Sequence, residues 1–173
     1  MTVAGEAELA RRAAGGDLTA FAVLVRAHEP GLRRYTRRLA GDDGDDLAQD
    51  ALLAGWRALG QWRGEGSLAA WFRTIATRRF LDQRRSLAGK AHHAPLSEAA
   101  HLEGRHSTEQ SVAVDRALAA LPDRERAAAL LVFGEGHSHS EAAAILGIPL
   151  GTLKSLVARA RAALIPLLEG VPS

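Results

Sequence analysis

A tight break at Gly147-Ile148-Pro149 limits what this chain can fold into more than any other feature. It lies within SHSEAAAILGIPLGTLKSLVARARAAL, residues 138–164, between a short helical pattern at about 140–146 and a longer one at about 150–168. Glycine and proline stop one helix and allow the next to begin at a new angle. Such a pair is either an αα-hairpin that packs into a core or a helix-turn-helix that places its second helix in a nucleic-acid groove.

Alanine and leucine dominate the composition, which favours helices over sheets. Apolar residues make up 47% of the 173 residues, whereas aromatic residues make up only 5%. Strands are rich in β-branched and aromatic residues, so the composition predicts an all-α fold. The apolar share is large enough for a packed core, and no internal repeat is evident.

Several classes of protein are excluded or disfavoured by simple counts. The chain has no cysteine, which excludes disulfides and thiolate metal sites and suits a reducing cytoplasm. Residues 1–18 are charged and lack the apolar stretch of a secretory signal. No window approaches the ~18 uncharged apolar residues of a membrane span. We therefore expect a cytoplasmic protein that does not insert directly into a membrane.

The helical patterns fall into two groups, which predict two small helical domains at residues 1–87 and 111–173. Residues 88–110 show no sustained period and are predicted to form a flexible linker. In the first group, Asp17 is the expected N-cap of a helix that Pro30 breaks or restarts and Gly41 ends. An acidic cluster at the start of the next helix is expected to cap its free N–H groups. The expected helices are 6–14, 17 to about 39, 45–59, 68–86, 109–120, 122–133, 140–146 and 150–168.

The last helix carries the residues that favour nucleic-acid binding over simple packing. Its predicted buried stripe consists of Leu153, Leu156 with Val157, Ala160 and Leu164. Small and polar residues at the start of the opposite face suit base edges in a major groove, and the arginines behind them suit phosphates. The candidate DNA-binding residues of this helix are Gly151, Thr152, Lys154, Ser155 and Arg159. The alternative is a helical hairpin whose outer face is only solvated.

A second candidate surface lies around a glycine-rich loop in the first group. Trp62 and Trp71 bracket the loop at 64–67, and an arginine-rich helix follows it. Basic groups beside a flexible loop with aromatic flanks suit a single strand with unstacked bases. The alternative is that both tryptophans are core residues and the arginines form a solvated face.

Three blocks, in the same order, resemble the extracytoplasmic-function (group IV) sigma factors of bacterial RNA polymerase. DDLAQDALLAGWRAL at 45–59 is similar to region 2.2 of that family, and WRGEGSLAAWFRTIATRRFLDQRR at 62–85 is similar to regions 2.3–2.4. LAALPDRERAAALLVFGEGHSHSEAAAILGIPLGTLKSLVARARAAL at 118–164 is similar to region 4. One block alone is a weak signal, whereas three blocks in the right order with a linker between them are specific.

The resemblance implies partners and roles for individual residues. It implies binding to core RNA polymerase, at the β′ clamp helices and the β flap, and to promoter DNA, with restraint by an anti-sigma factor. The clamp-binding residues would be Asp46, Leu47, Gln49 and Asp50. The loop at 63–68 would capture a flipped base of the minus-ten element, and residues 151–159 would enter the minus-thirty-five major groove. The implied DNA-binding residues of the first domain are Trp62, Arg63, Gly64, Ser67, Trp71, Arg78, Arg79 and Arg85.

Three positions depart from the family pattern and leave the promoter sequence undetermined. Arg78 stands where the family usually has asparagine, His139-Ser140 replaces a common Tyr-Glu, and Leu156 replaces an arginine. Two alternatives remain open at this point. One is a stand-alone helix-turn-helix regulator that acts without core polymerase. The other is an interaction module with a degenerate recognition helix.

No enzyme site is apparent in the sequence. Two histidine pairs, His92-His93 and His137 with His139, lack a third ligand at a known metal spacing. No glycine-rich phosphate loop, nucleophile elbow or carboxylate pair stands out. We therefore predict no catalytic residue, metal or cofactor.

Overall fold

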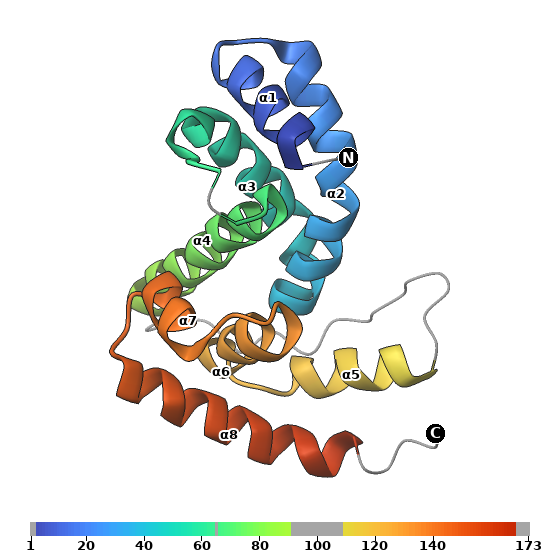
Figure 1. Cartoon of the computed structure of the whole chain (residues 1–173). Helices are drawn as coiled ribbons and strands as arrows, with labels where there is room; N and C mark the ends of the chain where they lie inside the picture. Colours follow the sequence, from blue (N-terminus) through green and yellow to red (C-terminus); the bar gives the residue numbers. More distant parts are fainter. Residues whose placement is uncertain (1–2, 65, 91–108, 169–173) are drawn as a thin grey trace.

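The computed structural model describes residues 3–64, 66–90 and 109–168, and all regular structure within these ranges is helical (Figure 1). This confirms the all-α class. The helices are α1 (Val3–Ala14), α2 (Leu18–Ala40), α3 (Gly44–Ala58), α4 (Leu68–Lys90), α5 (Glu109–Ala119), α6 (Asp123–Ala129), α7 (His139–Leu146) and α8 (Leu150–Leu168), with short 3-10 or π turns at Gly41–Asp43, Leu59–Gln61 and Leu130–Gly134. Helices α1 to α4 form the first half and α5 to α8 the second half. The predicted linker lies mostly outside the described residues.

The beginning and end of α2 agree with prediction, but its middle does not. The carboxylate of Asp17 accepts a hydrogen bond from the N–H of Ala20 at 3.0 Å, and this bond is the main reason why the pKa of Asp17 is lowered. Pro30 was expected to break the helix, yet α2 runs through it. A proline inside a helix removes one backbone hydrogen bond. Leu24 and Leu32, on either side of Pro30, are buried in one core, and this shared burial stabilises the continuous helix.

The acidic cluster at residues 42–46 does not cap α3, contrary to the prediction, but forms ion pairs with α2. No side chain caps α3 at Asp43. Asp45 instead accepts hydrogen bonds from Arg37 at 2.8 and 2.9 Å, and Arg33 lies 3.1 Å away. These arginines, Arg37 foremost, lower the pKa of Asp45. The cluster therefore ties α3 to the basic end of α2.

Helices α3 and α4 approach closely at a glycine. A Cβ built on Gly55 would lie 2.3 Å from a ring carbon of Phe72, which is fully buried. Contacts of this length do not occur between packed carbon atoms, so only glycine fits at this position.

We expect Gly55→Ala to lower the free energy of unfolding by about 1–3 kcal/mol, because the added methyl group overpacks the core against the buried ring of Phe72. Urea unfolding followed by circular dichroism measures this loss. The control is Gly60→Ala, since a Cβ at Gly60 meets no atom within 4 Å. Equal stability of the two variants would show that the α3–α4 contact is looser than described.

The second half is built around a helix pair with a sharp turn. The axes of α7 and α8 differ by 105°, within the 90–120° that is typical of a helix-turn-helix. Gly147 ends α7 in the left-handed conformation, with φ 63° and ψ 38°. The buried residues of α8 are Leu153, Leu156, Val157 and Ala160, and Leu164 is half-buried, as the stripe predicted.

The two halves are not separate, because one apolar cluster joins them. Tyr35, Leu39 and Phe80 of the first half pack with Leu118 and Leu130 of the second. In Figure 1, α5, α6 and α7 lie beside the lower ends of α2 and α4, and α8 lies beyond them, against α5, α6 and α7. The sequence predicted two tethered domains and gave no sign of this shared core.

No single helix among the described residues is long and apolar enough to cross a membrane. The α7–α8 pair passes such a test by length and composition only, and its bend and buried residues are those of a core element.

Candidate functional site

The outer face of α8 presents all five residues of this helix that the sequence assigned to DNA. Gly151, Thr152, Lys154, Ser155 and Arg159 are all exposed. The Ser155 hydroxyl donates to the carbonyl oxygen of Gly151 at 3.1 Å, and Arg159 donates to Glu125 of α6 at 2.7 Å. The side chains of Thr152 and Lys154 make no hydrogen bond or ion pair with other described residues. Their polar groups are therefore available at the N-terminal end of α8, where a recognition helix contacts base edges.

A capping box at the start of α7 fixes the first helix of the pair. The hydroxyl of Ser138 accepts a hydrogen bond from the N–H of Glu141, and the Glu141 carboxylate accepts one from the N–H of Ser138. The pKa of Glu141 is lowered because Ser138 stabilises its carboxylate, foremost through its side-chain hydroxyl and then through its backbone N–H. The sequence analysis missed this feature, although a serine followed by glutamate at the third position is its usual signal.

The loop between α3 and α4 is exposed where it turns and anchored at both ends. Arg63, Gly64 and Ser67 are exposed. The Ser67 hydroxyl accepts a hydrogen bond from the N–H of Ala70 at 3.1 Å and so caps α4. Gly64 has φ 76°, a conformation that side chains disfavour.

The two tryptophans that bracket the loop pack against the first-half core. Trp62 and Trp71 are both half-buried. Trp71 meets Phe72 edge-on, with ring centroids 5.5 Å apart. The buried Nε1 of Trp62 has no hydrogen-bond partner among the described residues. The alternative reading of these residues as anchors of the core is therefore supported, and a direct role in DNA binding stays a prediction.

The arginines of α4 lie beside the second half. Arg78 is exposed, and its Nε donates to the carbonyl oxygen of Ile145 in α7 at 3.1 Å. Arg79 is half-buried. Arg85 is exposed and pairs with Asp82 at 2.6 Å.

Three of the four residues assigned to polymerase binding share an accessible face of α3. Asp46 and Gln49 are exposed and Asp50 is half-buried. Leu47 differs, because only 2% of it is exposed and it belongs to the cluster between the halves. In this arrangement Leu47 positions α3 and offers no side chain to a partner.

The sequence analysis missed one residue on this face. Leu53 is 56% exposed, which is unusual for a large apolar residue in this core-forming helix. It follows Asp46 by seven positions and Gln49 by four, and this spacing places all three on one side of a helix.

No group of three potential metal-ligating side chains occurs in the described part of the chain. His137 is half-buried and His139 exposed, whereas the pair His92-His93 lies outside the described residues.

Two family models match the two halves in order. "Sigma-70 region 2" matches residues 24–89, in the helical first half, and "Sigma-70, region 4" matches residues 111–164, which include the helix-turn-helix. These matches define a transcription initiation factor of the sigma-70 type.

The chain belongs to the extracytoplasmic-function (ECF) sigma factors of RNA polymerase. It is 38% identical to ECF RNA polymerase sigma factor SigM of Mycobacterium tuberculosis, over 94% of this chain and 84% of that protein. It is 34% identical to ECF RNA polymerase sigma factor EcfG of Rhodopseudomonas palustris, over 83% of this chain and 82% of that protein. It therefore binds core RNA polymerase and directs promoter recognition, strand opening and transcription initiation.

Two solved structures have a similar fold. The sigma factor RpoE of Bartonella quintana, in complex with the anti-sigma factor NepR, aligns with a TM-score of 0.71 and 28% identity, over 90% of this chain and all of that one. CnrH, in complex with the cytosolic domain of CnrY, aligns with a TM-score of 0.60 and 27% identity, over 97% of this chain and 99% of that one. A stand-alone helix-turn-helix regulator is not favoured, because the match includes region 2 as well as region 4.

Proposed function

We propose that the two halves have different roles in promoter recognition and opening, and that particular residues carry each role. The α3 face with Asp46, Gln49 and Asp50 binds the β′ clamp helices of core polymerase. The loop at 63–67 captures an unpaired base of the minus-ten element. The exposed face of α8 reads the minus-thirty-five duplex, and the polymerase performs all catalysis.

The observation that carries this proposal is the position of two exposed surfaces on different halves. The loop around Arg63 and Gly64 is solvent-accessible between two anchored ends, which suits a base that has left its stack. The face of α8 around Thr152 and Lys154 is accessible along a rigid helix, which suits intact duplex. A domain boundary near residues 88–110 belongs to the same proposal.

We expect Arg63→Ala to reduce strand opening about tenfold and to leave the initial duplex complex unchanged, because a flipped base costs a few kcal/mol that the loop must offset. Permanganate reactivity of unpaired thymines measures opening with the reconstituted holoenzyme. Gel shift at low temperature measures the closed complex. Gln61→Ala is the control, since Gln61 is exposed just before the loop. Equal losses in both assays would contradict the division of labour.

We further propose that an anti-sigma factor restrains this protein in the cytoplasm, where the polymerase is found. Support comes from RpoE and CnrH, whose structures were solved as complexes with NepR and the cytosolic domain of CnrY. Co-purification of the tagged chain from its native host, with and without core polymerase, tests this partner.

A further inference from the structure

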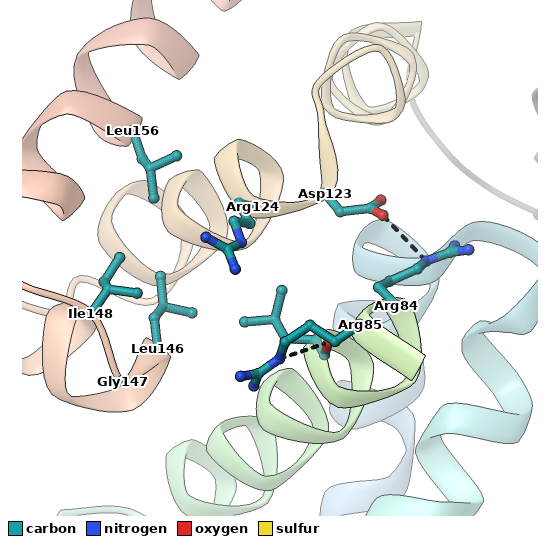
Figure 2. A pocket seen from close by; sticks show the side chains of 9 residues that line it. Arg84, Arg85, Asp123, Arg124, Leu146, Gly147, Ile148 and Leu156 are labelled. Atoms are coloured by element: carbon teal, nitrogen blue, oxygen red, sulfur yellow. Dashed lines mark hydrogen bonds and ion pairs between the residues drawn. The ribbon is translucent and has the colours of Figure 1, made fainter. Parts of the chain in front are cut away.

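Charged side chains contact α4, the helix that follows the loop at 63–67, at both of its ends. At the C-terminal end, Arg84 lies 3.3 Å from Asp123, beside a cavity of about 380 Å³ (Figure 2). At the N-terminal end the contact comes from α1. Helix α1 precedes the segment that matches region 2, residues 24–89, and none of its residues is assigned a role by the family motifs.

Glu6 of α1 contacts both the start of α4 and the middle of α2. Its Oε2 accepts a long hydrogen bond from the N–H of Leu68, with 3.4 Å between nitrogen and oxygen. Its Oε1 lies 2.8 Å from the buried Nε2 of His28, which has no hydrogen-bond partner among the described residues. Only 12% of the Glu6 side chain and 13% of the His28 side chain are exposed. The carboxylate is therefore held between two other helices in a mostly buried position.

The contact with Leu68 supplies an acceptor that α4 lacks. The first N–H groups of a helix have no acceptor within the helix itself. Ser67 satisfies the N–H of Ala70 and leaves that of Leu68 to another group. A carboxylate beside the first turn of a helix also interacts favourably with the positive end of the helix dipole. Glu6 therefore stabilises the point at which the loop ends and α4 begins.

Apolar contacts join α1 to both ends of the same loop. Ala10 and Ala13 of α1 are buried in one cluster with Leu59, which precedes the loop, and Leu68, which follows it. Helix α1 also packs against the short turn that begins at Leu59. Both ends of the loop thus rest on α1, and Glu6 adds a directed polar contact at the second end.

We propose that Glu6 is a positioning residue for promoter opening, whose carboxylate fixes the first turn of α4 and thereby the shape in which the loop at 63–67 receives an unpaired base. Its mostly buried side chain acts through Leu68 and does not touch DNA. His28 holds the second carboxylate oxygen, and its own ring lies 6.1 Å from that of Phe72 in the core. The consequence for DNA rests on the proposed function of the loop, whereas the effect on α4 does not.

The effect on α4 is tested by amide hydrogen exchange in the free, full-length chain, followed residue by residue by NMR. We expect Glu6→Ala to speed exchange of the Leu68 amide about tenfold, because its hydrogen bond to a charged acceptor is lost. Glu6→Gln keeps an acceptor oxygen and is expected to retain most of the protection. The control is Glu8→Ala, which removes the same charge from the same helix, where Glu8 pairs with Arg11. Equal Leu68 exchange in Glu6→Ala and Glu8→Ala overturns the contact.

The effect on opening is tested with the reconstituted holoenzyme and permanganate reactivity of unpaired thymines. We expect Glu6→Ala to reduce opening about tenfold without weakening the closed complex, and Glu6→Gln to restore most of it. In a promoter series, each minus-ten base in turn is replaced by an abasic sugar. At the captured position Glu6→Ala should add no further loss, because the loop has no base left to hold. An equal added defect at every abasic position makes Glu6 a stabilising residue only and overturns the proposal.

The comparison with Arg63→Ala separates this proposal from the proposed function. If Arg63→Ala impairs opening and Glu6→Ala does not, the loop keeps its proposed function and the positioning role of Glu6 is overturned. If neither variant impairs opening although Leu68 exchanges faster in Glu6→Ala, the proposed function of the loop fails. The positioning role in opening then falls with it, and only the contact between Glu6 and α4 stands.

Discussion

Reversing two charges on α3, with Asp46→Arg and Asp50→Arg, is expected to abolish detectable binding to core RNA polymerase. The two carboxylates lie one helical turn apart, and neither has an ion-pair partner among the described residues. Losing a charged contact at a protein interface costs about 2–5 kcal/mol, and reversing two charges adds repulsion. We therefore expect the affinity to fall at least about a thousandfold. Size-exclusion co-elution and fluorescence anisotropy with purified core enzyme measure this.

The control for this variant is Asp42→Arg. Asp42 is exposed in the same acidic cluster, but it precedes α3 and does not share the face of Asp46. A fold defect is excluded if the double variant keeps the circular dichroism and melting temperature of the parent chain. Equal weakening by Asp42→Arg would indicate a diffuse electrostatic attraction, and the proposed docking face would be wrong.

Leu53→Ala refines the same prediction. Its exposed side chain lies on the face of Asp46 and Gln49, and burial of such a side chain contributes about 1.5–3 kcal/mol. We expect weaker core binding with unchanged stability, since little of this side chain is buried in the free chain.

Replacing Thr152 and Lys154 with alanine is expected to remove promoter discrimination at the minus-thirty-five element. Both side chains are exposed at the N-terminal end of α8, and a base contact is typically worth about 1–3 kcal/mol. Two such contacts together are worth about 2–6 kcal/mol, so the holoenzyme should lose at least about 30-fold in preference for its own promoter over a promoter with a scrambled minus-thirty-five element. Run-off transcription with start-site sequencing across the promoters of the host identifies the promoter and measures the change.

Two comparisons separate base reading from phosphate attraction in α8. Arg159→Ala is expected to weaken binding to all sequences alike and to reduce the salt dependence by about one ion. Ala163→Gln is expected to change neither, because it lies exposed near the end of α8 and suits a helix. Loss of discrimination in Arg159→Ala alone would assign base reading to the arginine.

The helices and the helix-turn-helix were predictable because each depends on local signals. Apolar spacing placed the buried stripe of α8, and Gly147 placed the end of α7. Pro30 misled the prediction, because its local cost is outweighed by core packing on both sides of it. The prediction that Leu47 contacts polymerase was also wrong for this arrangement. The family motif gives the position of Leu47 along α3, whereas packing decides whether its side chain is accessible.

The sequence by itself determined the all-α class, the order of the two halves and the exposed face of α8 that we propose reads DNA. These follow from apolar periodicity, helix-ending residues and motif spacing, which act over a few residues along the chain. Only the tertiary structure decided that the halves meet, that Arg38, Arg73 and Arg84 face carboxylates of the second half, and that Leu47 lies between them. Contacts between residues far apart in sequence depend on surface shape and charge in three dimensions, and no local pattern records them.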